Sequence, residues 1–151
     1  MKNLFDKVRA EELKERVARL TPESPRQWGK MSPAQAVAHC ALGLQLPSGE
    51  QKPPRAGFPV RILGRIIKPL ALGDDKPMRR NSPTIPMLVM VGDCDLARER
   101  ERLCAAIDQF AAAGPAGCTD HPHTFFGRLT PNEWAILMYK HVDHHLRQFG
   151  V

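Results

Sequence analysis

The sequence predicts an all-α protein, a four-helix bundle with a long proline-rich crossover between its second and third helices. Apolar residues recur at helical spacing in four segments, residues 4–20, 32–46, 93–113 and 130–149. Eight of the 14 prolines lie between the second and third of these segments, and long crossovers are a known variation of such bundles. A chain of 151 residues can bury a substantial core, so we expect a single domain over residues 1–151.

The first predicted helix, residues 4–20, ends before the pair Thr21-Pro22 because proline cannot continue a helix. Its apolar stripe is expected to consist of Leu4, Phe5, Val8, Leu13, Val17 and Leu20.

The second and fourth predicted helices begin with the same signal. Ser32 and Thr130 are hydroxyl N-caps, each followed by a proline at the first helical position. Gln35 and Glu133 stand where a side chain can reach back and close a capping box. These signals predict where the helices start and do not bear on chemistry.

The third predicted helix, residues 93–113, ends at Gly114-Pro115. Cys94 and Cys104 fall within it and are expected to be small buried thiols. Because no two of the four cysteines have Cys-x-x-Cys spacing, a cysteine zinc site is not expected.

Within the crossover, residues 57–72 predict a short amphipathic helix. Arg61, Arg65 and Lys68 face one side, and five apolar residues share another: Val60, Leu63, Ile66, Ile67 and Leu70. This pattern is also typical of a helix on a membrane surface. We favour packing over the bundle, since the helix is short and contains Pro59 and Pro69. Residues 85–91 are expected to be extended, and the structure of residues 50–90 as a whole is left open.

The net charge of +6 is concentrated between residues 50 and 80, where eight Lys or Arg accompany three acidic residues. This excess could attract nucleic acid or small anionic substrates, or simply solvate the connector. Phe58 is the one aromatic residue of the region, so no base-stacking platform is evident and no nucleic-acid partner is expected.

No apolar run approaches the length of a membrane span, and the first residues lack a signal-peptide hydrophobic region. We therefore expect a cytoplasmic protein without a membrane partner. Whether it is a monomer or a homodimer is left open.

Three of the six histidines fall within five residues of the fourth predicted helix. At about 100° per residue, His141 and His145 lie about 40° apart in the middle of its apolar stripe. His144 lies at the flank, and Lys140 and Asp143 are expected to face solvent. Two imidazoles four residues apart on a buried helix face can converge on one divalent metal; the alternative is a pair of core histidines bonded to other polar groups.

His39, on the second predicted helix, is the third candidate ligand, because across a bundle it could meet His141 and His145. His121 and His123 lie in the loop before the fourth helix, where they could line the mouth of a site or be solvated. No carboxylate is evident as a general base, since Glu133 is explained as a cap, and the catalytic residues are unknown.

The chain resembles the DinB/YfiT-like superfamily, and within it a DinB-like family of unknown function. The resemblance is carried by Trp28-Gly29-Lys30-Met31-Ser32-Pro33, by His121-Pro122 with the run from Phe126 to Trp134, and by the run from His141 to Phe149. It covers most of the chain and is weakest over residues 50–90. One additional residue, His123 or a neighbour, lengthens the loop.

The resemblance implies a four-helix bundle in which three histidines, here His39, His141 and His145, bind a divalent metal. Characterised branches of the superfamily include mycothiol and bacillithiol transferases and a mycothiol-dependent maleylpyruvate isomerase. It therefore implies a metal-dependent enzyme acting on a small molecule, either a thiol-dependent S-transferase with a low-molecular-weight thiol as co-substrate or a related hydrolase. The alternative is a non-catalytic, stress-related metal-binding bundle. Zinc, nickel, iron and manganese all accept imidazole ligands, so the metal is not decided.

Overall fold

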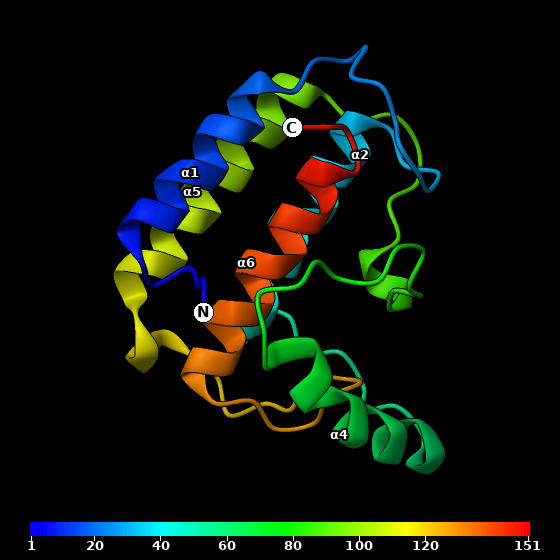
Figure 1. Cartoon of the computed structure of the whole chain (residues 1–151), viewed down its shortest axis with the longest axis vertical. Helices are drawn as coiled ribbons and strands as arrows, with labels where there is room; N and C mark the ends of the chain where they lie inside the picture. Colours follow the sequence, from blue (N-terminus) through cyan, green and yellow to red (C-terminus); the bar gives the residue numbers. More distant parts are fainter.

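The computed structural model describes all 151 residues and is all-helical (Figure 1). It contains no strand, only one isolated β-bridge between His123 and Gly127. The elements in chain order are α1 (Lys7–Arg19), α2 (Pro33–Gly43), α3 (Gln45–Ser48), α4 (Phe58–Leu72), the 3-10 helix η1 (Pro86–Leu88), α5 (Leu96–Ala113), the 3-10 helix η2 (Pro115–Gly117) and α6 (Pro131–Arg147).

Helices α1, α2, α5 and α6 pack around one apolar core. α1 lies against α5 and α6, and α2 also lies against α5 and α6 (Figure 1). Residues buried between them include Leu13, Val17, Leu103, Ile107 and Val142, each no more than 1% exposed. The predicted all-α class is confirmed, and α2 is thereby held beside α6.

Both predicted capping boxes are confirmed. The Ser32 and Thr130 hydroxyls accept hydrogen bonds from the backbone N–H of Gln35 and Glu133, at 3.2 Å each. The Gln35 and Glu133 side chains accept from the backbone N–H of the two cap residues in return. These contacts define the register at which α2 and α6 begin.

Two predictions near the starts of helices were wrong. Val8, expected in the core stripe of the first helix, is 70% exposed. The side chain of Asp6 caps the helix, so α1 begins at Lys7, and Ala10, Leu13 and Val17 form its buried face. Cys94 lies outside α5, because the Asp95 side chain accepts from the Arg98 N–H and starts the helix at Leu96.

The segment between α2 and α5 contains α3, α4 and η1. The predicted short helix is confirmed as α4, but its expected packing was wrong: most of its apolar side chains are exposed. Residues 85–91 are not extended throughout, because Pro86–Leu88 forms a 3-10 turn that buries Leu88. None of the helices is both long and apolar enough to cross a membrane.

The solvent-facing assignment of Lys140 and Asp143 was also wrong, since they are 7% and 6% exposed. The ammonium of Lys140 donates to the carbonyls of Ala71 and Asp74, at 2.6 and 3.0 Å. The end of α4 thus covers a side of α6 that its own sequence pattern predicts to be open.

Candidate metal centre

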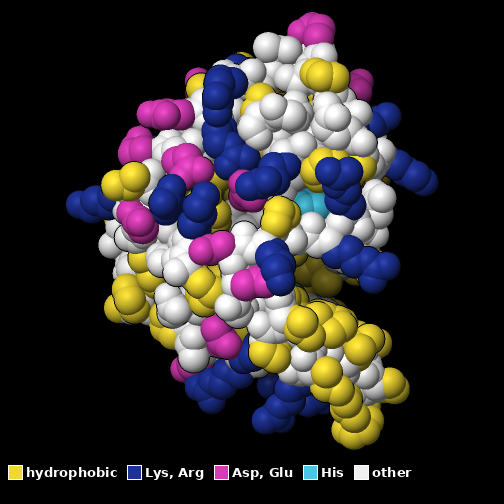
Figure 2. All heavy atoms as spheres, viewed as in Figure 1, with side chains coloured by type: hydrophobic (Ala, Val, Ile, Leu, Met, Phe, Trp, Pro, Cys, Tyr) yellow, Lys and Arg dark blue, Asp and Glu magenta, His cyan; other side chains and the backbone are white.

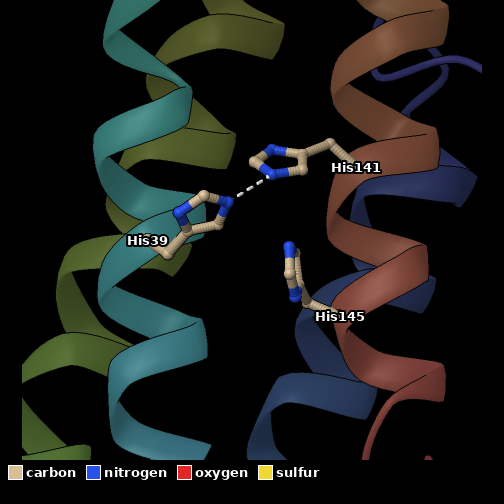
Figure 3. Close-up of side chains that lie close together, drawn as sticks. All are labelled: His39, His141 and His145. Atoms are coloured by element: carbon tan, nitrogen blue, oxygen red, sulfur yellow. Dashed lines mark hydrogen bonds between the residues drawn. The ribbon is translucent and has the colours of Figure 1, made fainter. Parts of the chain in front are cut away.

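His39 on α2 and the pair His141 and His145 on α6 point toward one another across the gap between the two helices (Figure 3). The Nε2 atoms of His39 and His141 are 2.8 Å apart. One ring nitrogen from each of the three residues lies within 4.8 Å of the other two. The structure therefore brings together the three histidines that the sequence singled out, in a group that could hold a metal ion.

Hydrogen bonds fix the ring orientation of His39 and His145. The Nδ1–H of His39 donates to the Leu88 carbonyl at 2.7 Å, and that of His145 donates to the Gln148 Oε1 at 2.9 Å. Because a carbonyl oxygen only accepts, both Nδ1 atoms carry a proton and both Nε2 atoms present a lone pair. Outer-shell partners of this kind are the usual means of orienting metal-bound imidazoles.

Gln148 is itself held in one orientation. Its Nε2 donates to the Trp28 carbonyl at 2.8 Å, which turns its oxygen toward His145, and the residue is 2% exposed. The Trp28 carbonyl thereby determines which atom of the amide meets the imidazole.

His141 depends on a glycine for its position. A Cβ added at Gly43 would lie 2.9 Å from the His141 Cε1 and 3.0 Å from its Nδ1. Any larger residue at position 43 would displace the His141 ring from its present position.

Burial keeps the three imidazoles neutral at neutral pH. Desolvation lowers the pKa of His39, and together with the neighbouring imidazoles it lowers that of His141 well below its ordinary value. The pKa of His145 is lowered to about 3, mainly by burial. Since the neutral ring is the form that binds a metal, all three ligands are in their binding form at neutral pH.

The donor set fits a divalent transition metal. Three imidazoles with no thiolate or carboxylate leave coordination positions open, which is typical of catalytic rather than closed structural sites. The thiol nearest in sequence to His39 belongs to Cys40, which is buried and whose pKa is raised by desolvation. It is therefore an unreactive core residue.

His144 lies outside the three-histidine cluster. Its ring packs against Trp28, with the ring centroids 5.4 Å apart. The guanidinium of Arg80 lies over the Trp28 ring, 4.1 Å from its centroid. Figure 2 shows a histidine side chain at the surface, bordered by Lys and Arg side chains.

The loop histidines are not part of the cluster. The Nδ1 of His123 accepts from the backbone N–H of Phe125 and Phe126, and its ring lies 5.6 Å from that of Trp134. Burial lowers its pKa to about 4. The Nε2 of His121 lies 3.1 Å from the Pro53 carbonyl. His123 is thus a partly buried structural residue of the loop, outside the three-histidine cluster.

Sequence reasoning missed the residues that support the cluster. Gln148 follows His145 by three positions, a spacing at which helical side chains meet, so this contact could have been predicted. The contact of Leu88 could not have been predicted, since its backbone carbonyl reaches His39 only through the fold of the crossover.

These features define an all-helical protein with a cluster of three histidines, one buried and two partly buried. The chain matches the model of a family described as "protein of unknown function (DUF1569)" over residues 5–150 and belongs to that family. No curated protein matches the chain, and neither does any solved structure.

Proposed function

We propose that this protein is a metal-dependent enzyme of the DinB-like superfamily that acts on a small molecule, as a thiol-dependent S-transferase. The convergence of three histidine rings, with the Nε2 atoms of His39 and His141 2.8 Å apart, carries the proposal. The resemblance of the motifs around Trp28, Trp134 and His141 supports the superfamily. On this proposal, α1, α2, α5 and α6 are the DinB-like four-helix bundle, the segment before α5 is its proline-rich crossover, and the protein acts in the cytoplasm.

His39, His141 and His145 would hold the ion, while Gln148 and the Leu88 carbonyl keep two of the rings aimed at it. A divalent metal bound there supplies Lewis acidity, which stabilises a thiolate or hydroxide at neutral pH. Thiolate is the nucleophilic form of a thiol. The chain's own part is to fix the ligands and to bury them from competing water.

Lys or Arg side chains near the metal site would attract anionic co-substrates, such as thiols that carry carboxylates. Among the basic residues of the crossover, Arg80 lies over Trp28, and Trp28 packs on His144, whose ring contacts that of His145. Lys68 is instead ion-paired with Glu133, at 2.8 Å, near the start of α6. We therefore assign the attraction of anions to Arg80 rather than to the charges of α4.

A second candidate function is metal binding without catalysis. It is favoured by the tight packing on the core side of the cluster, where the void beside His145 measures only about 10 Å³. That volume holds about one water molecule, so a substrate would have to approach from the outer side.

Elemental analysis of protein purified without a histidine tag tests the metal site. We expect close to one ion per chain in the wild type and a strong loss in His39→Ala, His141→Ala and His145→Ala. His144→Ala is the matched control and should retain most of the metal. Loss in His144→Ala with retention in His145→Ala would reject the ligand set.

A thiol-consumption assay with a panel of electrophiles then separates the two functions. Metal-loaded wild type should consume thiol faster than His141→Ala, and Arg80→Gln should raise KM for anionic thiols more than it lowers kcat. If the wild type binds metal but consumes thiol no faster than His141→Ala, the non-catalytic function is favoured.

A further inference from the structure

Helix α4 presents a large apolar face to solvent. Phe58, Ile66 and Leu70 are 72%, 62% and 76% exposed, and Ile62 and Leu63 are about half exposed, at 47% and 50%. In Figure 2 these side chains form an apolar projection at the end of the molecule where Figure 1 places α4. Contiguous exposed apolar surface of this kind marks an interaction site in a folded protein.

The opposite side of α4 attaches it to the rest of the molecule. Gly64 lies directly against the Phe125 carbonyl, where a Cβ has no room. Lys68 forms an ion pair with Glu133 and donates to the Arg128 carbonyl at 3.2 Å. At about 100° per residue, Gly64 is roughly 160° from Ile66, so the exposed apolar face points away from the protein body.

The charge around this face has one sign. Between Gln51 and Gly73 the chain has five Lys or Arg and no Asp or Glu. Lys68 is the one cation of the five in an ion pair, which leaves Lys52, Arg55, Arg61 and Arg65 without an acidic partner. On the helix itself, Arg61 and Arg65 lie about 40° apart at one edge of the apolar face.

We propose that α4 docks this protein on an anionic lipid surface, with Phe58, Ile62, Ile66 and Leu70 entering the boundary between headgroups and acyl chains. An amphipathic helix with an acid-free basic edge binds such surfaces through buried apolar area together with attraction to anionic headgroups. The sequence-based expectation of no membrane partner assumed that α4 covers its apolar face with the bundle, which it does not do.

Charge disfavours a second copy of the chain as the occupant. Two α4 helices packed face to face would bring Arg61 and Arg65 of each copy together, and α4 has no acidic residue to meet them. Like charges at close range oppose such a contact, whereas anionic lipid supplies the missing sign.

Co-sedimentation with vesicles tests the proposal. We expect the full-length protein to bind phosphatidylcholine vesicles containing phosphatidylserine more tightly than pure phosphatidylcholine vesicles, and less tightly as salt is raised. The double variant Ile66→Glu/Leu70→Glu should weaken binding by roughly tenfold or more, because it removes two buried apolar side chains. Val8→Glu is the matched control, since Val8 is equally exposed on α1, and it should bind like the wild type.

Arg61→Gln/Arg65→Gln provides a second test that does not depend on the apolar face. Each neutralised arginine should weaken binding to the anionic vesicles by roughly fivefold at low salt. Circular dichroism and metal content should be unchanged in these variants, and His141→Ala should bind vesicles normally, so failure of the metal site and failure of the lipid site are distinguishable.

Three results would overturn the proposal. The first is that the wild type does not bind anionic vesicles. The second is that the wild type and Ile66→Glu/Leu70→Glu bind them equally. The third is that the wild type does not bind lipid but self-associates as its concentration rises, and that this double variant abolishes the self-association. The last result would assign the face to a second copy of the chain.

Discussion

Each imidazole of the cluster has a different support, and each support can be removed separately. Leu88 holds His39 through the backbone, Gln148 holds His145 through a side chain, and Gly43 leaves space for His141. A residue that never touches the ion can therefore control whether the ligands converge.

Gln148→Leu should weaken metal binding by roughly 10- to 100-fold while the protein stays folded, because the His145 ring loses its oriented hydrogen-bond acceptor. Competition titration with a chromogenic chelator measures the change. Gln27→Leu serves as the control, because Gln27 is exposed and its side-chain amide donates only to the Pro25 carbonyl. Unchanged affinity in Gln148→Leu would show that the orientation of His145 does not depend on this contact.

Gly43→Ala should lower metal affinity without lowering helix content. The added Cβ would lie 2.9 Å from the His141 ring and displace it, while alanine favours a helix over glycine by about 1 kcal/mol. Gly57→Ala is the control, since nothing lies within 4 Å of a Cβ added there. The same chelator titration, together with circular dichroism, separates the two effects, and equal affinity in both variants would contradict the assigned role.

His123 should make stability depend on acid pH. Its folded pKa is about 4 against an ordinary value of 6.5, so below pH 6.5 the unfolded chain binds the proton and the folded chain does not. Stability is therefore fully present above pH 6.5 and falls as pH drops toward 4, by up to about 3 kcal/mol.

Denaturant unfolding at pH 7 and pH 4.5 checks this against His123→Asn, which keeps an acceptor for the Phe125 and Phe126 N–H groups but does not titrate. The variant should lose less stability on acidification than the wild type. NMR titration of the His123 ring near its ordinary pKa would contradict the prediction.

At the scale of the element, α6 has two functional sides. One carries His141 and His145, and the other carries the buried Asp143, which accepts from Arg16 and Arg147 at 2.7 Å each. Arg16 also donates to the Val151 carbonyl, at 3.0 Å. These contacts fix the rotation of α6 against α1, and with it the direction in which the histidines point.

Asp143→Ala should destabilise the protein by about 3 kcal/mol, because it leaves the Arg16 guanidinium, only 11% exposed, without its closest carboxylate. Asp120→Ala removes the partner of Arg128 from a pair that is 91% and 75% exposed, and should cost less than about 1 kcal/mol. Chemical denaturation of the two variants provides the comparison. Equal losses of unfolding free energy in the two variants would show that the Asp143–Arg16 ion pair stabilises the protein no more than an exposed pair does.

At the scale of the whole molecule, the cluster joins two helices that lie about a hundred residues apart in the sequence, with 102 positions between His39 and His141. On the proposed function, an ion bound only by the folded chain stabilises it by mass action.

Added zinc or nickel should raise the melting temperature of metal-free wild type by roughly 5–10 °C when the metal is at a hundredfold excess over its dissociation constant. His141→Ala should show no comparable shift, and His144→Ala should behave like the wild type. Differential scanning calorimetry measures this, and identical melting curves for wild type with and without metal would argue against a preformed site.

Much of this protein is determined locally in its sequence. The capping boxes at Ser32 and Thr130 satisfy backbone donors within a few residues, so the starts of α2 and α6 could be predicted correctly. The spacing of His141 and His145 likewise placed both on one face of α6 without knowledge of the fold.

Tertiary structure decided the rest, because burial depends on which distant segment covers a surface. The end of α4 buries Lys140, and Arg16 buries Asp143, although the pattern of α6 alone assigns both to solvent. No segment covers the apolar face of α4, which its own pattern assigns to the interior. The Leu88 carbonyl reaches His39 from 49 positions away. Periodicity within a helix shows which residues share a side, whereas only the packing of remote segments decides which side is buried.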